Sequence, residues 1–451
     1  MKPTFSKQAE QIERIISSPY NKKGHEDFCS AVKTVVVVVC SPRSGSSLLA
    51  SIFRRTDQLL NFQGAITPFL GLANLRYPES GDSDALTVEQ LPTAIANNLP
   101  LYLGQECGTL SESLPDQQSK DQFAVDLAIR LCMQWPMIDF DVENVRQAML
   151  EALESLVSEL GWKEGAFEDV ELFHAVFLKY LCRVYPQVNP YLYDIDKDLI
   201  ARFMPDVEPV AVLPSSRFIE MPPLITISPW KPASAEDLAN KSVIIKTVAN
   251  TFRLSFLKAL FPQARFRILH LTRRIAASAN GMYDGWHFPG FWAARVDRDL
   301  QIPGYSDVYP EWGKRWWKFG LAPGWQNMTD RPVVELAAFH WRTCHETILQ
   351  WLDDHPDIKA DSLRIKFEDL LGSPREKQNV YTELTDWLNI ELDDDLAFAR
   401  DNDMPLQLAT AKPAPERWRK RIDLLRPVLE NPANIALMRR LGYEPDLAVI
   451  D

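Results

Sequence analysis

Hydrophobic residues form one unbroken run close to the start of the chain. Five valines, Val35 to Val39, follow one another without an intervening polar residue. Strands of a parallel sheet are buried on both faces and show such continuous runs, whereas half-exposed strands alternate between apolar and polar residues. The apolar residues that resume at Leu48 have helical character. The pattern therefore predicts a buried strand from Thr34, a short loop and a helix that reaches Arg55.

Apolar runs alternate with helical periodicity again in the second half of the chain. Segments 242–247 and 265–274 are predicted strands, 363–371 is a predicted strand-to-helix joint, and a long helix is expected at 333–352. Strands that alternate with helices favour a mostly parallel sheet. The fold class is therefore α/β, with a P-loop-like sheet flanked by helices and a large helical insertion after the first strand-helix unit.

The insertion begins near Gln63, where the periodicity becomes mainly helical. Seven prolines between Pro205 and Pro232 interrupt regular structure, so an irregular return to the sheet is expected there. Three parts follow from these patterns: an N-terminal helical arm at 1–33, an α/β core made of 34–62 and 241–451, and the helical insertion at 63–240.

Composition narrows the possible partners. The chain has 451 residues and a formal net charge of −12, which argues against a general nucleic-acid or anionic-membrane surface. Any anion must therefore be held by a local positive pocket. No apolar stretch approaches the ~18 residues of a membrane span and no leader pattern opens the chain, so a cytoplasmic location is expected. The six cysteines lack C-x-x-C spacing and are expected to be buried free thiols.

The loop after the valine strand carries the clearest chemistry. Ser41 to Ser47 are small, mostly hydroxyl-bearing residues with one cation, Arg43. A strand, a tight loop and a helix N-terminus aim unpaired N–H donors at one point, where phosphate is the usual guest. The loop of nucleotide triphosphatases reads G-x-x-x-x-G-K-[ST], but no lysine follows Gly45 here. A serine-rich turn that only links strand and helix is the plain alternative.

The order Pro-Arg-Ser-Gly-Ser-Ser resembles the 5′-phosphosulfate-binding loop of sulfotransferases that use 3′-phosphoadenosine 5′-phosphosulfate (PAPS), which commonly reads P-[RK]-[SA]-G-[ST]-[ST]. The resemblance implies that the whole loop binds this cofactor, through Pro42, Arg43, Ser44, Gly45, Ser46 and Ser47.

Later segments resemble the same family, in the order along the chain that the family has. "LTRRIAASANG" is similar to its 3′-phosphate motif and implies Arg273 and Ser278, although the common Arg-to-Ser spacing is eight and here it is five. Two arginines that only cap a strand end are the alternative. "FEDL" is similar to Y-E-D-L and puts Phe367 near the adenine. "ERWRKR" resembles a basic segment that folds over the 3′-phosphate, which implies Trp418, Arg419, Lys420 and Arg421.

The resemblance implies transfer of a sulfuryl group from PAPS to a hydroxyl or amine, with adenosine 3′,5′-bisphosphate as product and no metal. Lys246 resembles the family's K-T joint and could reach the bridging oxygen, unless it is a lysine at the core edge. Many members place a histidine base directly after K-T, but this chain has Val248 there. His287, which lies among aromatic residues just past the phosphate-binding helix, is the favoured base, and Asp284 or a carboxylate from the insertion is the alternative.

The histidines of the predicted core are weaker candidates for a base. His345 falls on the apolar stripe of the long helix, so it is expected to be a core residue, and His270 lies within a predicted strand.

The acceptor is left open by the sequence. Thirteen tryptophans, several in clusters after His287, suggest an aromatic pocket for a small molecule or a carrier-tethered intermediate, or merely packing of the insertion on the sheet. The insertion at 63–240 is the expected acceptor-recognition region. One alternative function is a small-molecule kinase, which would need a loop lysine and a metal-holding aspartate. The second alternative is a nucleotide-binding module without catalysis.

Overall fold

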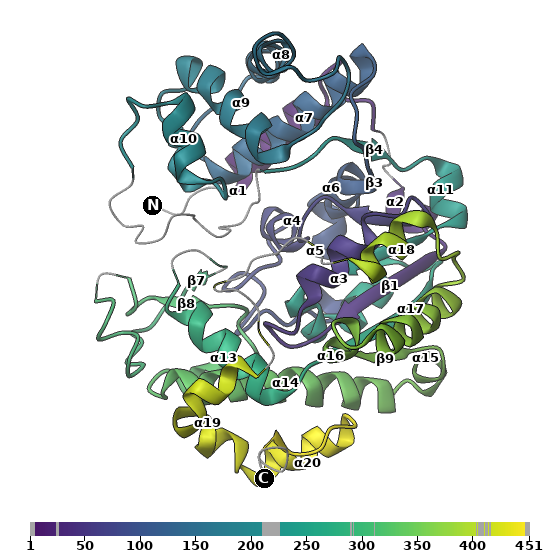
Figure 1. Ribbon diagram of the computed structural model, residues 1–451, viewed down its shortest axis with the longest axis vertical. Helices are drawn as coiled ribbons and strands as arrows, with labels where there is room; N and C mark the ends of the chain where they lie inside the picture. The colour runs from purple at the N-terminus through teal and green to yellow at the C-terminus, as the bar shows by residue number, and fades with distance from the viewer. Residues whose placement is uncertain are drawn as a thin grey trace.

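The computed structural model describes residues 5–23, 27–209, 226–288, 291, 293–310, 312–402, 404, 410, 414 and 416–446. A seven-stranded sheet crosses its centre in the order β4-β3-β2-β5-β1-β6-β9 (Figure 1). Strands β2, β5, β1, β6 and β9 are parallel, and β3 and β4 extend the β2 edge antiparallel. The sheet strands are β1 (Thr34–Val39), β2 (Leu59–Phe62), β3 (Cys107–Leu110), β4 (Trp230–Pro232), β5 (Ser242–Lys246), β6 (Arg265–Thr272) and β9 (Leu363–Lys366). The predicted α/β class and parallel core are confirmed.

Helices cover both faces of the sheet, and further helices form a separate layer above it (Figure 1). Their bounds are α1 Phe5–Ile16, α2 Phe28–Ala31, α3 Ser46–Phe53, α4 Thr67–Leu72, α5 Leu91–Ala96, α6 Leu99–Glu106, α7 Gln117–Gln134, α8 Val142–Leu160, α9 Val170–Val184, α10 Lys197–Phe203, α11 Ala235–Asn240, α12 Leu254–Leu260, α13 Ile275–Trp286, α14 Val333–Asp353, α15 Pro356–Ala360, α16 Phe367–Leu370, α17 Pro374–Leu388, α18 Asp394–Asp401, α19 Ile422–Leu429 and α20 Pro432–Arg440.

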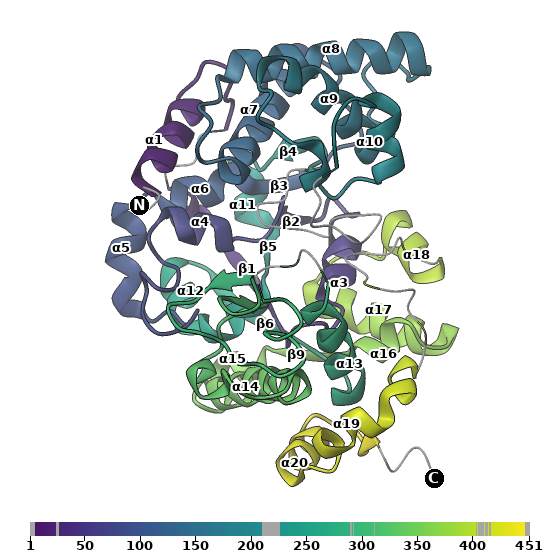
Figure 2. The same cartoon turned by 90° about the vertical axis from the view of Figure 1, so that its left-hand side faces the viewer.

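The valine run explains the centre of the sheet. Strand β1 lies between β5 and β6, and its five valines are at most 1% exposed. Because side chains alternate along a strand, Val35 and Val37 enter the core under the N-terminal helices, whereas Val36 and Val38 enter the core under α3 and α17. Figure 2 shows α3, α17 and α18 on one side of the sheet and α12 and α15 on the other. Each apolar position of the run thus has a partner layer.

Region 63–240 is mainly helical, but it also supplies β3 and β4 to the main sheet. These strands have four and three residues, too short to show a periodicity in the sequence. Between Phe203 and β4, residues 204–209 are neither helix nor strand. Residues 210–225, with Pro214, Pro222 and Pro223 of the predicted return, lie outside the described residues.

The N-terminal segment, predicted as a helical arm, packs against the helical region through α1. Ile12 and Ile15 of α1 are buried, and Gln8 Nε2 donates to the Cys132 carbonyl at the end of α7 at 2.9 Å. A buried ion pair reinforces this contact. Lys23 Nζ lies 2.9 Å from an Asp126 carboxylate oxygen, with both side chains at most 3% exposed.

A smaller sheet pairs β7 (Ala293–Arg295) with β8 (Trp316–Lys318) beside α13. Three fully buried tryptophans pack at this sheet. The Trp317 ring contacts the rings of both Trp286 and Trp325. These three tryptophans form core rather than the wall of an open pocket. No helix among the described residues is both long and apolar enough to cross a membrane.

Replacing Lys23 with Ala should lower the free energy of unfolding by about 3–5 kcal/mol, because Asp126 would be left buried without its cation. The exposed pair Arg14–Asp139 provides the control, and Arg14→Ala should leave stability nearly unchanged. Urea unfolding of both variants measures the difference. Equal losses for the two variants would contradict the buried pairing.

Candidate functional site

The loop between β1 and α3 has the shape of an anion cradle. Arg43 and Gly45 adopt left-handed conformations, with φ of 62° and 88°. A side chain at Gly45 would clash with the Phe367 ring, so this position requires glycine for space as well as for conformation. Ser41 and Ser44 are buried, and their hydroxyl oxygens lie 2.7 Å apart. The N-terminal N–H groups of α3 follow directly after the loop.

Lys246 reaches this loop from the neighbouring strand. Strand β5 pairs parallel with β1, so Lys246 stands opposite Val38 and both strands end at the same edge. Lys246 Nζ lies 3.1 Å from Ser47 Oγ at the start of α3. The structure therefore brings the predicted lysine and the predicted loop together.

Arg273 approaches from the other side, at the end of β6. Its Nη1 donates to the Arg43 carbonyl at 2.7 Å, and its guanidinium lies 4.6 Å from the centre of the Phe367 ring. Phe367 follows β9, the next parallel strand. Lys246, Arg43, Arg273 and Phe367 thus lie at the ends of four adjacent parallel strands, on one edge of the sheet. Ligands of open α/β sheets bind at this edge.

Ser278 lies in α13, fully buried, and its hydroxyl has no hydrogen-bond partner in the part of the chain that the structure describes. It stands three residues before Gly281, whose backbone faces Arg43, so the two positions share a face of the helix. A buried hydroxyl without a partner costs free energy. A polar group bound next to Ser278 would satisfy it, which fits an anion held beside Arg273.

The C-terminal basic segment, η5 (Arg417–Arg421), is anchored on α13 through Asp284. Arg417 and Arg421 both pair with the Asp284 carboxylate, at 2.6 and 2.7 Å, and Arg421 also donates to Asn280. The Asp284 carboxylate thus pairs with the guanidiniums at both ends of this segment. Asp284, the alternative base, is therefore an anchor for the C-terminal segment.

The other predicted residues of this segment lie differently. Trp418 is buried against α13 and α14, Arg419 pairs with Glu416 at 2.7 Å, and Lys420 is exposed. Arg417 was not among the residues expected from the sequence. The only signal for it was one more arginine in "ERWRKR", which did not distinguish it from its neighbours.

The site concentrates positive charge. Burial, together with the positive charges of Arg273 and Arg417, lowers the pKa of Arg43 to about 10, and the carboxylate of Asp284 opposes this shift. Burial also lowers the pKa of Arg273, and Arg417 adds to that effect. The three guanidiniums are therefore close enough to repel one another, and a bound anion would relieve this repulsion.

His287 caps the C-terminal end of α13, away from the loop. Its ring lies between Tyr283 and Tyr309, with ring centres 4.7 and 6.0 Å away. Burial lowers its pKa, and Nε2 has no hydrogen-bond partner among the described residues. It follows Gly281, which faces the Arg43 stem, by six residues, about 9 Å along the helix axis.

The remaining histidines and cysteines of the prediction are structural. His270 and His345 are buried and share a hydrogen bond of 2.9 Å between Nε2 and Nδ1, as expected of core residues. All six cysteines are free, and only Cys182 is partly exposed.

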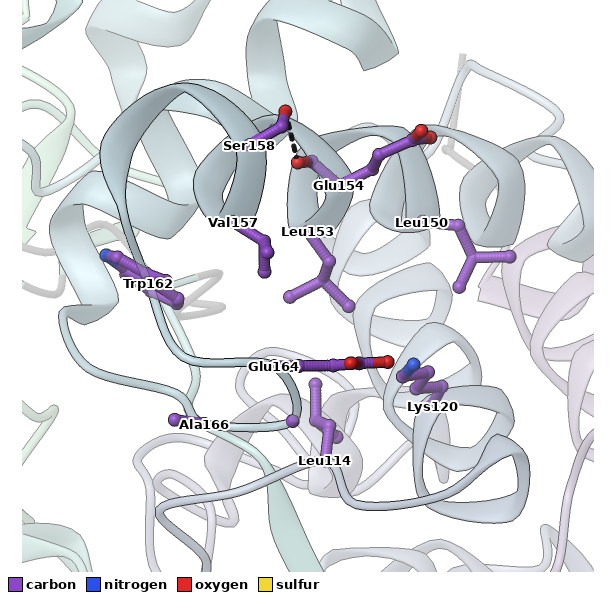
Figure 3. A pocket seen from close by; sticks show the side chains of 11 residues that line it. Leu114, Lys120, Leu150, Leu153, Glu154, Val157, Ser158, Trp162, Glu164 and Ala166 are labelled. Atoms are coloured by element: carbon purple, nitrogen blue, oxygen red, sulfur yellow. Dashed lines mark hydrogen bonds between the residues drawn. The ribbon is translucent and has the colours of Figure 1, made fainter.

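A separate cavity of about 290 Å³ lies in the helical region, between α8 and the turn that follows it (Figure 3). Leu150, Leu153 and Val157 line its wall, and Lys120 and Glu164 approach each other across it. None of the residues predicted for the cofactor lines this cavity.

Comparison with known proteins gives only distant structural neighbours. No family model matches the chain, and no curated protein matches it. Similar solved structures are the sulfotransferase domain from the curacin biosynthetic pathway (13% identity, 92% of this chain and 99% of that chain, TM-score 0.35) and the sulfotransferase domain from the Synechococcus PCC 7002 olefin synthase (14%, 91% and 96%, 0.32). A third is sulfotransferase STF1 from Mycobacterium tuberculosis (11%, 82% and 71%, 0.31). At such low identity and TM-score, function has to be read from this chain's own residues.

Arg417 and Arg421 offer a matched test of the charge cluster, because both pair with Asp284 but only Arg417 lies within electrostatic reach of Arg43 and Arg273. Arg417→Ala should weaken binding of inorganic sulfate roughly tenfold or more, and Arg421→Ala should change it little. Thermal unfolding in sodium sulfate, against sodium chloride of equal ionic strength, measures this. Equal weakening of sulfate binding by both variants would contradict a particular contribution of Arg417 to the charge cluster.

Proposed function

We propose that the protein is a sulfotransferase that uses PAPS as the donor of a sulfuryl group. The observation that carries the proposal is the meeting of Lys246, Arg43 and Arg273 around a small-residue loop at the ends of three adjacent parallel strands. Such a cluster suits a ligand with two separate anionic groups, as PAPS has.

The residues fit the two ends of that donor. The loop N–H groups and Lys246 would hold the 5′-phosphosulfate, and Arg273 with Ser278 would hold the 3′-phosphate. Phe367 contacts both Gly45 and Arg273, so its ring would lie beside the adenosine. The unsatisfied hydroxyl of Ser278 supports this assignment despite the unusual spacing.

In the proposed reaction the bond from sulfur to the bridging phosphate oxygen breaks, and a new bond forms from sulfur to an acceptor oxygen or nitrogen. Negative charge grows on the leaving phosphate, and Lys246 would stabilise it. The acceptor loses its proton to a base or to water. As in phosphoryl transfer, the protein contributes mainly positioning and electrostatic stabilisation.

As part of the same proposal, the acceptor is a small molecule or a carrier-tethered intermediate. The aromatic residues that continue from α13 toward β7 and β8 support an apolar acceptor, since Phe288, Phe291 and Phe319 follow one another in ring contact beside Arg43. A kinase is disfavoured by the absence of a loop lysine after Gly45.

Adenosine 3′,5′-bisphosphate should raise the unfolding temperature, whereas ATP with magnesium should not, because only the former places a phosphate near Arg273. Arg273→Ala should weaken the nucleotide by about 2–3 kcal/mol, through loss of a charge-assisted contact. Thermal unfolding and calorimetry measure the two effects. Equal stabilisation by ATP would favour the kinase instead.

His287 provides the test of the base. Since burial lowers its pKa, its neutral, proton-accepting form persists to pH values below about 6.5, and the rate should fall on acidification only below that value. His287→Asn should lower turnover by roughly 10²–10⁴ and leave affinity for adenosine 3′,5′-bisphosphate unchanged.

The control for this experiment is His355→Asn, since His355 stacks on Trp351 in another part of the fold. A pH–rate profile of the three proteins measures the effect. If wild type and His287→Asn share one acidic limb and similar rates, the base is another group or the solvent.

A further inference from the structure

Helix α13 carries two glycines on one face, and side chains from two other segments fill the space beside them. A Cβ at Gly281 would lie 3.2 Å from the Cβ of Arg43, and a Cβ at Gly285 would lie 2.6 Å from the Phe319 ring. Positions four residues apart share a helix face. The stem of Arg43 and the ring of Phe319 therefore lie against the same face of α13.

Phe291 joins these two residues. The Arg43 guanidinium carbon lies 5.0 Å from the centre of the Phe291 ring, and the rings of Phe291 and Phe319 lie 5.8 Å apart at an angle of 40°. Phe291 is only 5% exposed, so this contact between cation and ring is largely removed from water. We call Phe291 and Phe319 the aromatic clamp.

Backbone strain points to the same three residues. Arg43, Phe291 and Phe319 have φ of 62°, 56° and 62°, a region that large side chains seldom adopt and that costs free energy. Such residues persist only where their surroundings hold them, and they cluster at functional sites. Three of the other four described non-glycine residues with positive φ are asparagines, which tolerate it.

The clamp sets where the charge of Arg43 stands. Arg273 Nη1 donates to the Arg43 carbonyl at 2.7 Å. The stem of the Arg43 side chain packs against Gly281, and the Arg43 guanidinium lies over the Phe291 ring. Lys246, by contrast, extends to Ser47 at the start of α3. Two cations of one site therefore have separate positions, one at the loop and one beside the aromatic residues.

We propose that Phe291 and Phe319 are positioning residues that hold the Arg43 guanidinium for the transfer step, rather than for binding of the nucleotide. This inference rests on the proposed sulfotransferase function. A guanidinium held in advance needs no reorganisation when charge develops, so the clamp should affect turnover and leave nucleotide affinity alone.

The experiment is a double-mutant cycle in the full-length protein, with PAPS and an acceptor that the wild type sulfates. Phe291→Leu should lower kcat about tenfold or more, and Phe319→Leu should act in the same direction. Affinity for adenosine 3′,5′-bisphosphate should stay within about twofold. In an Arg43→Ala background, Phe291→Leu should lower kcat no further.

Phe398→Leu is the matched control, because Arg55 lies 4.7 Å over that exposed ring in another part of the fold. It should leave kcat unchanged. If Phe291→Leu lowers kcat equally with and without Arg43, or weakens the nucleotide as much as it slows turnover, the clamp does not position Arg43 and the proposal is wrong.

Thermal unfolding separates this result from failure of the proposed function. If the wild type transfers no sulfuryl group from PAPS to any acceptor tried, the sulfotransferase proposal fails, and the clamp is then tested by stability alone. The losses in unfolding temperature from Arg43→Ala and Phe291→Leu should be less than additive, since each removes the same contact. Additive losses would overturn the clamp.

Discussion

The repulsion among cations at the carboxyl edge of the central strands is the constraint on which the rest of the site depends. The chain as a whole is acidic, with a net charge of −12, yet Arg43, Arg273 and Arg417 lie within electrostatic reach of one another. Burial has already lowered the pKa of the first two. A folded protein keeps such a cluster only if other contacts hold each cation, or if an anion compensates them.

The fold supplies those contacts from distant parts of the chain. Trp341 of α14 donates to the Arg273 carbonyl at 3.0 Å, and Phe367 stacks against the Arg273 guanidinium. Asp284 holds Arg417 from α13. Figure 2 shows α13 between the sheet and the C-terminal helices. This one helix therefore contacts the loop after β1 and also anchors the C-terminal basic segment through Asp284. The cations are thus arranged before any ligand arrives, which lowers the cost of ordering them on binding.

The sequence predicted the parts of the fold that have long, regular patterns. The valine run, the strands predicted at 242–247 and 265–274 and the helix of α14 show their periodicity directly, and the loop from Pro42 to Ser47 is a local motif. The short strands β3, β4, β7 and β8 have three or four residues each, so their pairing depends on where the chain returns and not on their own pattern.

The site divides in the same way. Lys246 and Arg273 could be predicted because each ends a strand next to β1, and parallel order then brings them to the loop. The anchoring of Arg417 by Asp284 joins residues 133 positions apart, and the contact of Arg43 with Phe291 joins segments even further apart in the chain. Nothing local in the sequence distinguishes such pairs, so the ion pairs of Asp284 with Arg417 and Arg421 are visible only in the fold.

A crystal structure with adenosine 3′,5′-bisphosphate tests the central claim most directly. The account predicts that the 5′-phosphate lies within about 3.2 Å of Lys246 Nζ and of the N–H groups at 44–47, and that the 3′-phosphate contacts Arg273 and Ser278. Phe367 should then lie against the adenosine. A nucleotide bound away from this edge of the sheet, or with its two phosphates exchanged between Lys246 and Arg273, would contradict the account.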